Sequence, residues 1–448
     1  MMKDEAKATA QLAVPIIIGE LAQMSLHIID TAMVGALGYR ELAATALVMN
    51  AMNIPFVLGI GMTISVSQMV SLSNGRKDAA AVSHYLYNGF ILCTITAIVI
   101  ACTLVFGRNL LAYLGQDKQV VELALPLMTL MGFSIIPMLL FMTLKQFADG
   151  LEFTRTAMLL SLIALPINVL LNWLLIYGHW SFPALGLLGA GWATLITRTV
   201  IFIALGAIIL KHKTFAHYIE LGKVHWTLKR RTLKELLQIG VPSSLQIGME
   251  AGVFAVSGLI IGTIGAVAQA AHQIALSCAS FTFMVSMGLA QAGSIRVSNA
   301  YGGGKWNKIF VIGKSTLVIA LFYGLLCAIG FTVFRGDLPK LFNAHEGVIS
   351  LATTLLLFAA VFQISDSTQA IGAGLLRGVK DVKTPTVLIA IAYWVLGLPL
   401  GLLLAFRFDM GAAGMWTGLI AGLTFASVSL IQRFLSKARK NLKLESRA

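Results

Sequence analysis

Charged side chains are scarce in this sequence. Only 12% of its 448 residues are Asp, Glu, Lys or Arg, whereas 58% are hydrophobic. A soluble domain carries about 25% charged residues, so most of this chain must face a medium other than water. The composition therefore excludes an ordinary water-soluble globular protein.

Ten-residue segments of alternating apolar and polar residues are also missing, which excludes a membrane β-barrel. Apolar stretches such as 91–106, 317–334 and 386–406 instead approach the roughly 20 residues that a helix needs to cross a bilayer. Because hydrocarbon offers no partner for backbone N–H and C=O groups, these stretches must be helical. We therefore predict an all-α integral membrane protein.

Motifs for metal or redox chemistry are absent too. The sequence contains no C-x-x-C or H-E-x-x-H motif, no phosphate-binding loop and no Ser/His/Asp constellation. The four cysteines lie inside apolar segments and are expected to be small hydrophobic residues: Cys93, Cys102, Cys278 and Cys327. The first ten residues are polar and mixed in charge, unlike a cleavable signal peptide. We expect no enzymatic activity and no cofactor.

The apolar pattern predicts twelve transmembrane segments, at residues 11–36, 42–72, 83–107, 119–148, 157–178, 186–210, 237–262, 268–300, 309–334, 345–376, 384–406 and 411–434. With the N-terminus inside, few of the 33 basic residues fall in outer loops: Arg40, Arg108, Lys118, Arg335, Lys340 and Arg407. This bias follows the positive-inside rule and predicts cytoplasmic termini. The net charge of +14 then reports topology and does not indicate binding to nucleic acid.

The two halves of the chain repeat one design. An offset of 227 residues aligns proline with proline and glycine with glycine, at Pro15 and Pro242, Gly61 and Gly288, and Gly75 and Gly302. After one inserted residue, Gly150 aligns with Gly378. Six helices in each half make parallel repeats, with a substrate site expected at their interface. We predict lobes at 1–210 and 235–448, joined by a basic cytoplasmic linker at 211–234.

Ionisable residues inside predicted helices need an explanation, because each costs about 2.5–3.5 kcal/mol at the bilayer centre on insertion scales. In the first helix, Asp30 is a candidate for binding a proton, a monovalent cation or a cationic substrate, and a helix-end role is the alternative. His27 lies three residues earlier on the same face. Glu20 shares this face, and either residue can line a cavity or neutralise the other. Arg198 receives no role.

Polar groups in other helices extend this set. Asn168 and Asn172 lie one turn apart, so their amides point the same way and suit either ion binding or contact between helices. Glu250 and Asp366 lie deep in helices of the second half, with no Lys or Arg near them in sequence. A shared cation or proton site explains this acidic pair better than structure does. Phe283, Met284 and Phe362 suit an adaptable binding surface, although such residues also pack or face lipid.

Seven segments resemble the multidrug and toxic compound extrusion (MATE) transporters, specifically their NorM-type branch. They are I-D-T-A-M-V-G at 29–35, A-D-G at 148–150, I-N-V-L-L-N-W at 167–173, A-A-H-Q-I-A-L at 270–276, S-I-R-V at 294–297, L-R-G-V-K-D at 376–381 and Y-W-V-L-G-L-P at 393–399. The resemblance covers essentially the whole chain. It implies two six-helix lobes that export hydrophobic, mostly cationic compounds in exchange for Na⁺ or H⁺. It also implies a bacterial inner-membrane location.

The resemblance also implies roles for individual residues. Asp30 matches the first-helix acid of the family, with Asn168, Asn172 and Thr194 as its partners. Glu250 and Asp366 match the cation site of the NorM branch, which favours Na⁺ coupling. Gln273 matches a position that faces the central cavity. Phe362 stands where relatives can carry a Tyr beside the cation site, and this departure puts an aromatic oxygen contact there in doubt.

The sequence thus favours an efflux antiporter that works by alternating access, needs no obligate protein partner and can act as a monomer. A flippase for lipid-linked oligosaccharides is the first alternative, but it would want a cationic central cavity, whereas the candidate residues here are acidic. An integral-membrane lipid enzyme is the second alternative, and it lacks a reactive constellation.

Overall fold

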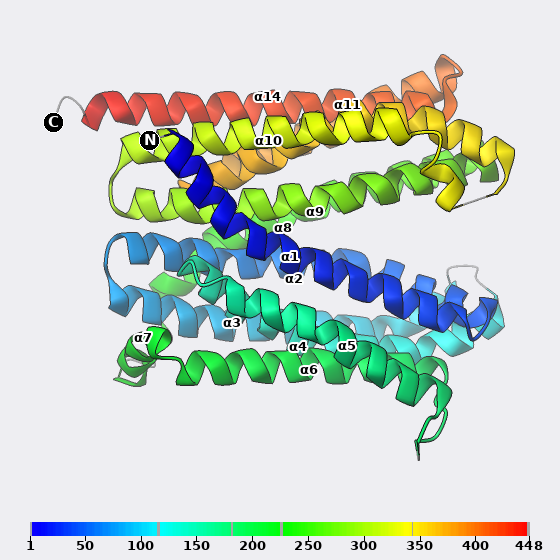
Figure 1. Ribbon diagram of the computed structural model, residues 1–448, viewed down its shortest axis with the longest axis horizontal. Helices are drawn as coiled ribbons and strands as arrows, with labels where there is room; N and C mark the ends of the chain where they lie inside the picture. Colours follow the sequence, from blue (N-terminus) through cyan, green and yellow to red (C-terminus); the bar gives the residue numbers. More distant parts are fainter. Residues whose placement is uncertain (1, 114–116, 181, 225–226, 343, 446–448) are drawn as a thin grey trace. The chain divides into compact units, whose positions relative to one another are not determined.

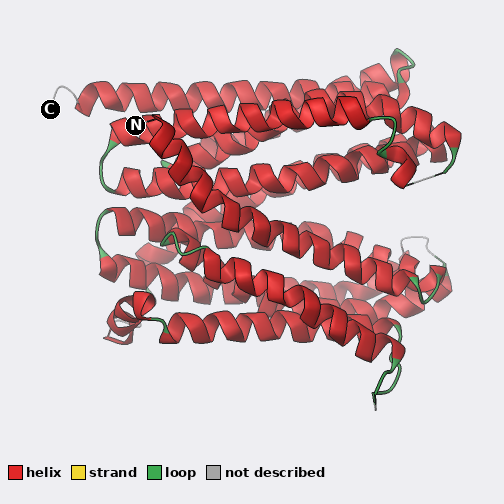
Figure 2. Cartoon of the chain, viewed as in Figure 1, coloured by secondary structure: helices red, strands yellow, loops and turns green. Residues whose placement is uncertain are grey.

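Every regular element in the described part of the chain is helical (Figures 1 and 2). The structure is a computed structural model that describes residues 2–113, 117–180, 182–224, 227–342 and 344–445, without the side chains of 220–224. In these ranges twelve helical segments are long and apolar enough to cross a membrane. The predicted twelve-helix membrane architecture is confirmed.

The first half of the chain forms α1 (Met2–Gly35), α2 (Tyr39–Gly75), α3 (Ala79–Gly107), η1 (Arg108–Tyr113), α4 (Lys118–Gly150), α5 (Arg155–Tyr177), α6 (Leu187–Lys211) and α7 (Lys213–Val224). The second half forms α8 (Arg230–Ile264), α9 (Ala266–Gly302), α10 (Trp306–Phe334), η2 (Pro339–Leu341), α11 (Glu346–Gly378), α12 (Lys383–Ala390), η3 (Ile391–Gly397), α13 (Leu398–Leu402), η4 (Leu403–Arg407) and α14 (Gly411–Glu445). Most of the predicted linker is therefore helical, as α7, and its residues 225–226 lie outside the described ranges.

Two compact units divide the chain. One comprises residues up to Ile17 together with those from Leu245 onward, and the other comprises Ile18–Ser244. These units differ from the lobes expected at 1–210 and 235–448, because the opening segment of each half belongs with the helices of the other half. Arg296 of α9 helps to hold the start of α1, since it bonds to Thr9 and forms an ion pair with Glu5.

Two glycines allow these opening segments to approach closely. A Cβ added to Gly61 in α2 would collide with the backbone of Ser244 in α8. A Cβ added to Gly288 in α9 would collide with Ile17 in α1. At the offset of 227 residues Gly61 aligns with Gly288, and Ile17 aligns with Ser244. The repeat seen in the sequence is thus also a repeat of backbone contacts.

One central helix organises each unit. α4 packs against α2, α3 and α6, and α11 packs against α9, α10 and α14. A Cβ on Gly150 of α4 would lie 2.8 Å from the carbonyl oxygen of Ser67, and one on Gly378 of α11 would lie 2.7 Å from that of Ser294. These paired close contacts support the predicted alignment of Gly150 with Gly378.

The corners between helices repeat as well. Lys77 after α2 and Gly304 after α9 have positive φ angles of 59° and 70°. Glu152 after α4 and Lys380 after α11 have φ angles of 64° and 58°. A left-handed backbone is uncommon for residues other than glycine. Its recurrence at aligned positions indicates that the packing of each repeat imposes the same turn.

A buried ion cluster lies in the unit formed by Ile18–Ser244. The ammonium of Lys145 in α4 lies 2.9 Å from a carboxylate oxygen of Glu20 in α1 and 3.4 Å from one of Asp149. Lys145 and Asp149 are each no more than 1% exposed. Of the alternatives open for Glu20 and His27, neutralisation by His27 is not what Glu20 shows, because its counter-charge is Lys145 of another helix.

The close packing of α14 predicts a large effect from a single methyl group. A Cβ on Gly418 would collide with the backbone of Gly401 in α13, which cannot move without the helix. We expect Gly418→Ala to lower stability by about 1–3 kcal/mol, seen as earlier thermal unfolding in detergent. Gly330→Ala in α10 is the matched control, since nothing lies within 4 Å of its Cβ position. Equal melting of the two variants would contradict this packing.

The buried ion cluster predicts that loss of Lys145 alone is strongly destabilising. Lys145→Met leaves two carboxylates without their ammonium partner, and breaking a buried pair from one side costs about 3–5 kcal/mol. We expect a large loss of folded protein by size-exclusion chromatography after heating, with partial recovery when Glu20→Gln and Asp149→Asn are added.

The control for this experiment is Lys340→Met, which breaks the exposed pair between Lys340 and Asp337. We expect only a small change in this variant, because exposed ion pairs contribute little. If Lys145→Met were as mild as Lys340→Met, the buried cluster would not contribute to folding.

Candidate functional site

The sequence-predicted residues of the first half meet at one point. Asn172 of α5 donates to one carboxylate oxygen of Asp30 in α1 at 2.6 Å, and Thr194 of α6 donates to the other at 3.1 Å. Asn172 also donates to the side-chain oxygen of Asn168 at 3.0 Å. All four residues are at most 5% exposed. Two helices, α5 and α6, thus present polar groups to one buried carboxylate of α1.

The hydrogen bonds of this cluster are incomplete. The side-chain oxygen of Asn172 and the side-chain nitrogen of Asn168 are buried, and neither has a partner among the described residues. Because a buried polar atom without a partner is costly, such atoms mark a place where an ion, water or ligand group is expected. Only the amide oxygen of Asn172 is free here, because that of Asn168 accepts a hydrogen bond from Asn172.

A small cavity adjoins this cluster. It has a volume of about 30 Å³ and is lined by Thr194, together with His27 of α1, Ser161 of α5 and Arg198 of α6, among others. The side-chain nitrogen of Gln23, also in the lining, is buried without a partner. This volume and polarity suit one or two water molecules.

Arg198 supplies the positive charge of this region. It is 6% exposed and donates to the hydroxyl of Ser134 in α4 at 2.7 Å. Its charge is also close enough to interact with the carboxylate of Asp30 and with His27. Asp30 therefore has a buried counter-charge, which the sequence did not reveal because 168 positions separate the two residues.

The acidic pair of the second half also converges. Glu250 of α8 and Asp366 of α11 are close enough for their carboxylates to interact electrostatically. The phenol of Tyr393 donates a long hydrogen bond of 3.4 Å to Glu250, and it also interacts with Asp366. Asp366 is 3% exposed, and no described residue donates a hydrogen bond to its carboxylate. Two buried carboxylates this close together require a bound cation, a proton or a basic group to balance their charge.

An irregular helix presents Tyr393. The span that begins at Lys383 changes from α-helix to π-helix over Ile391–Gly397, which contains this residue. A π-helical turn widens the helix and shifts the side chains that follow, and such turns are frequent at functional sites. Tyr393 is fully buried, and its ring packs against Phe254 of α8. The phenol is therefore held beside Glu250 by the backbone and by ring packing.

One positive charge reaches the acidic pair. The guanidinium of Arg377, near the end of α11, interacts electrostatically with Glu250. Its Nε atom is buried without a hydrogen-bond partner in the described structure. Sequence distance concealed this contact, since Arg377 lies 127 positions from Glu250. The pair has a partial counter-charge even though no basic residue is near either acid in sequence.

The other predicted site residues differ in exposure. Phe362 is 3% exposed and packs edge-on against Phe254 and Trp416. Its ring brings no oxygen to the acidic pair, and the phenol that approaches the pair belongs to Tyr393. Gln273 of α9 is exposed, whereas Phe283 and Met284 of the same helix are half-buried. These three residues are available to a ligand to different degrees.

Sequence reasoning missed Tyr393, Arg377 and Lys145 as members of these clusters. Signals for the first two were present, because Tyr393 opens the segment Y-W-V-L-G-L-P and Arg377 lies in L-R-G-V-K-D. A polar residue inside a segment that matches a family is a candidate even when no role is known for it. Lys145 had no such signal.

Comparison with known proteins identifies the family. The MatE family model matches residues 15–174 and 242–403, one match in each half, which agrees with the internal repeat. The probable multidrug resistance protein NorM of Mesorhizobium japonicum is 32% identical over 98% of this chain and 95% of its own length. The multidrug resistance protein NorM of Photobacterium profundum is 32% identical over 96% of this chain and 95% of its own.

Solved structures share the fold. A MATE transporter in a bent conformation superposes with a TM-score of 0.91 at 20% identity, covering 99% of this chain and 97% of its own. A eukaryotic MATE transporter superposes with a TM-score of 0.88 at 21% identity, covering 98% of each chain. The chain belongs to the MatE family and is a multi-pass membrane transporter of the NorM multidrug-efflux type.

Proposed function

We propose that this transporter exports hydrophobic, mostly cationic compounds in exchange for Na⁺, with the coupling ion bound at Glu250 and Asp366. H⁺ is the alternative coupling ion at the same pair. The protein would lie in the inner membrane of a bacterium with both termini in the cytoplasm, as the distribution of basic residues predicts. It would act without a cofactor and as a monomer.

The charge balance around the acidic pair is the observation that carries this proposal. Two carboxylates, Glu250 and Asp366, interact with each other, and one guanidinium, that of Arg377, interacts with Glu250. One negative charge is then left over in a largely buried place, where an uncompensated charge is costly. A single monovalent cation balances it, and the phenol oxygen of Tyr393 is a further oxygen ligand near it.

The cluster in the first half has a different balance. Asp30 has one counter-charge, Arg198, and accepts hydrogen bonds from Asn172 and Thr194, so its carboxylate is already compensated. A second Na⁺ is less favourable there than at the acidic pair. We propose that Asp30 exchanges Arg198 for a cationic substrate or a proton during transport, which makes it a second station in the cycle.

Substrate contacts are proposed for Asp30, Gln273, Phe283, Met284 and Phe362. Aromatic and methionine side chains adapt to ligands of different shape, which suits an exporter of varied compounds. The exposed amide of Gln273 supplies a polar contact. The buried ring of Phe362 would reach a ligand only after its neighbours rearrange.

Coupling needs more than affinity. An ion changes the balance between two conformations only if it binds one of them more tightly, and the same holds for the substrate. We propose that the ion favours the state that releases substrate and that the ion-free protein favours the state that accepts it. Reciprocity then requires the coupling ion to weaken substrate binding.

The test is efflux of a fluorescent lipophilic cation from proteoliposomes, with Na⁺ and pH gradients imposed separately. We expect a Na⁺ gradient alone to drive efflux, and Glu250→Gln and Asp366→Asn each to slow it about tenfold or more, equivalent to about 1.4 kcal/mol. Glu346→Gln is the matched control, because it removes one negative charge from an exposed position on the same helix as Asp366.

Two results would contradict the proposal. Efflux driven only by a pH gradient, with Asp30→Asn as the inactive variant, would assign coupling to the first half. Activity that persists without any ion gradient would instead favour a flippase or a lipid enzyme over an antiporter.

Tyr393 gives a finer prediction. Tyr393→Phe keeps the ring that packs on Phe254 and removes only the hydroxyl, a loss of about 1 kcal/mol or less for such a long hydrogen bond. We expect the Na⁺ concentration for half-maximal efflux to rise about two- to fivefold with little change in maximal rate. Tyr177→Phe is the control, because its hydroxyl bonds to the carbonyl of Met33, and both residues belong to the unit that does not contain the acidic pair. An unchanged Na⁺ dependence in Tyr393→Phe would remove the phenol from the site.

A further inference from the structure

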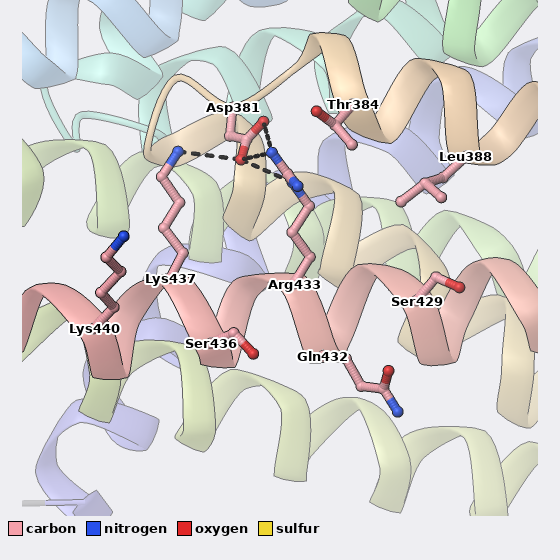
Figure 3. Close-up of a pocket in the computed structure, with 9 residues that line it drawn as sticks. All are labelled: Asp381, Thr384, Leu388, Ser429, Gln432, Arg433, Ser436, Lys437 and Lys440. Carbon is pink, nitrogen blue, oxygen red and sulfur yellow. Dashed lines mark hydrogen bonds and ion pairs between the residues drawn. The ribbon is translucent and has the colours of Figure 1, made fainter.

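A basic pocket of about 560 Å³ lies between the start of α12 and the end of α14 (Figure 3). Its lining includes three basic residues, one acid, several hydroxyl or amide groups and one aliphatic residue: Arg433, Lys437, Lys440, Asp381, Thr384, Ser429, Gln432, Ser436 and Leu388. None of them belongs to the acidic pair or to the Asp30 cluster. The pocket therefore needs its own explanation.

The three basic side chains follow one face of α14. Arg433, Lys437 and Lys440 are four and three positions apart, which aligns them along the helix. In Figure 3 all three project from the same side of α14 toward the loop that carries Asp381. Lys440 is exposed and forms no ion pair with any described residue. The lining thus has a clear excess of positive charge.

Asp381 positions two of these cations without using all their donors. Arg433 donates to its two carboxylate oxygens at 2.9 and 3.2 Å, and Lys437 lies 3.1 Å from one of them. A guanidinium has five N–H donors and an ammonium has three, so both groups retain donors for an anion. A carboxylate that orients two cations and leaves them with free donors makes a preorganised anion site.

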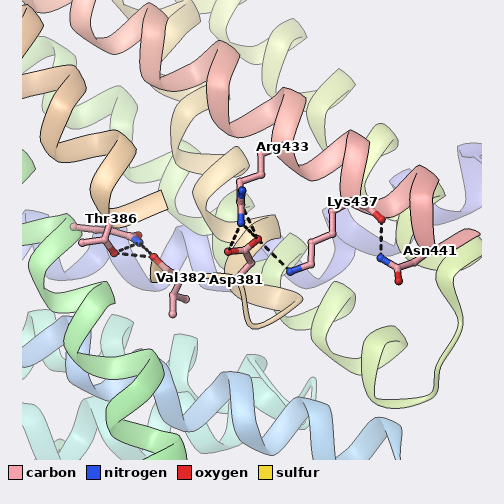
Figure 4. A network of polar contacts seen from close by, with 7 residues as sticks. Asp381, Val382, Thr386, Arg433, Lys437 and Asn441 are labelled. Carbon is pink, nitrogen blue, oxygen red and sulfur yellow. Dashed lines mark hydrogen bonds and ion pairs between the residues drawn. The ribbon is translucent and has the colours of Figure 1, made fainter. Parts of the chain in front are cut away.

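The loop itself is fixed from the other side. Gln246 of α8 donates to the carbonyl of Val382 at 3.1 Å and to the hydroxyl of Thr386 at 2.9 Å (Figure 4). Asn441 donates to the carbonyl of Lys437 at 2.8 Å, one turn further along α14. Hydrogen bonds therefore hold the residues that line the pocket both at the start of α12 and at the end of α14.

The pocket lies where α14 stops being apolar. The helix carries no charged residue from Gly411 to Ile431, and all of its basic residues follow this stretch. That transition is expected at the level of the lipid headgroups. Leu388 in the lining and the exposed Val387 beside it offer apolar contact on the α12 side. A ligand here meets cations and apolar side chains together.

The duplicated fold does not require this basic end. Gly186, just before α6, and Gly411, the first residue of α14, have the same φ of 55°. When these two glycines are aligned, Lys211 at the end of α6 corresponds to Ser436. α14 continues to Glu445 and carries Lys437 and Lys440 on this extension. The pocket is thus a feature that the second half has in addition to the shared design.

We propose that this pocket binds the phosphate headgroup of an anionic phospholipid from the membrane leaflet at this end of the helices. Basic pockets between transmembrane helices bind such headgroups through their phosphate oxygens. Inorganic phosphate shares this chemistry, but the apolar contacts at Leu388 and the position at the headgroup level favour a lipid. The proposal does not depend on which ion drives transport.

The test uses delipidated full-length protein and native mass spectrometry, with phosphatidylglycerol and phosphatidylcholine of identical acyl chains titrated separately. We expect phosphatidylglycerol to bind more tightly, and Lys440→Gln to weaken it about fivefold, the effect of removing one basic charge near a lipid surface. Lys440→Gln is the primary variant because it leaves the contacts of Asp381 intact. Lys437→Gln should give a similar loss while Arg433 still holds Asp381.

Arg439→Gln is the matched control. It removes the same charge from an exposed position of the same helix, outside the pocket lining, and should change binding much less than Lys440→Gln does. Equal binding of the two lipids, or equal effects of Lys440→Gln and Arg439→Gln, would overturn the proposal. If millimolar inorganic phosphate displaced phosphatidylglycerol completely, the pocket would be a site for a free anion, and the proposal of a lipid ligand would be overturned.

Discussion

Hydrocarbon cannot solvate a charge, and this constraint governs how the buried ionisable groups of the protein are paired. Lys145 has Glu20 and Asp149, Arg296 has Glu5, and Asp30 has Arg198 within electrostatic range. Each of these partners comes wholly or partly from another helix, so charge compensation also holds helices together. The acidic pair differs, because Glu250 and Asp366 interact with each other and only Glu250 has a counter-charge in range, that of Arg377. An incomplete balance in a buried place is what makes this pair the candidate for a mobile ion.

Duplication supplied two copies of one scaffold, and divergence placed different chemistry in each. The close contacts of Gly61 with Ser244 and of Gly288 with Ile17 are the same contact in two repeats. The polar clusters are not: the first half has one carboxylate with amide and hydroxyl partners, and the second half has two carboxylates and a phenol. The two repeats therefore share their backbone packing but differ in their buried charged groups. A coupling ion and a substrate can then bind to different halves of the chain.

Much of the fold followed from the sequence because membrane helices obey local rules. Length and hydropathy predicted twelve spans, and the aligned glycines predicted the repeat that close packing at Gly150 and Gly378 now displays. The convergence of Asp30 with Asn168, Asn172 and Thr194 agrees with the family resemblance. Other features depended on distant contacts. Nothing near Glu20 in sequence indicated Lys145, and Asp149 is buried although helix-end acids commonly reach water. The helix α7 inside the predicted linker also went unrecognised.

The sequence by itself determined that this protein lies in a membrane, how many helices cross it, that the chain is duplicated and to which family it belongs. These properties depend on composition, periodicity and the order of motifs. Only the tertiary structure decided which charges neutralise one another, because partners such as Asp30 and Arg198 meet through packing between helices far apart in the chain. The same holds for Tyr393, which a π-helical turn presents to Glu250, and for the basic pocket around Asp381. Hydropathy is a sum over neighbours in sequence, whereas electrostatic balance is a sum over neighbours in space.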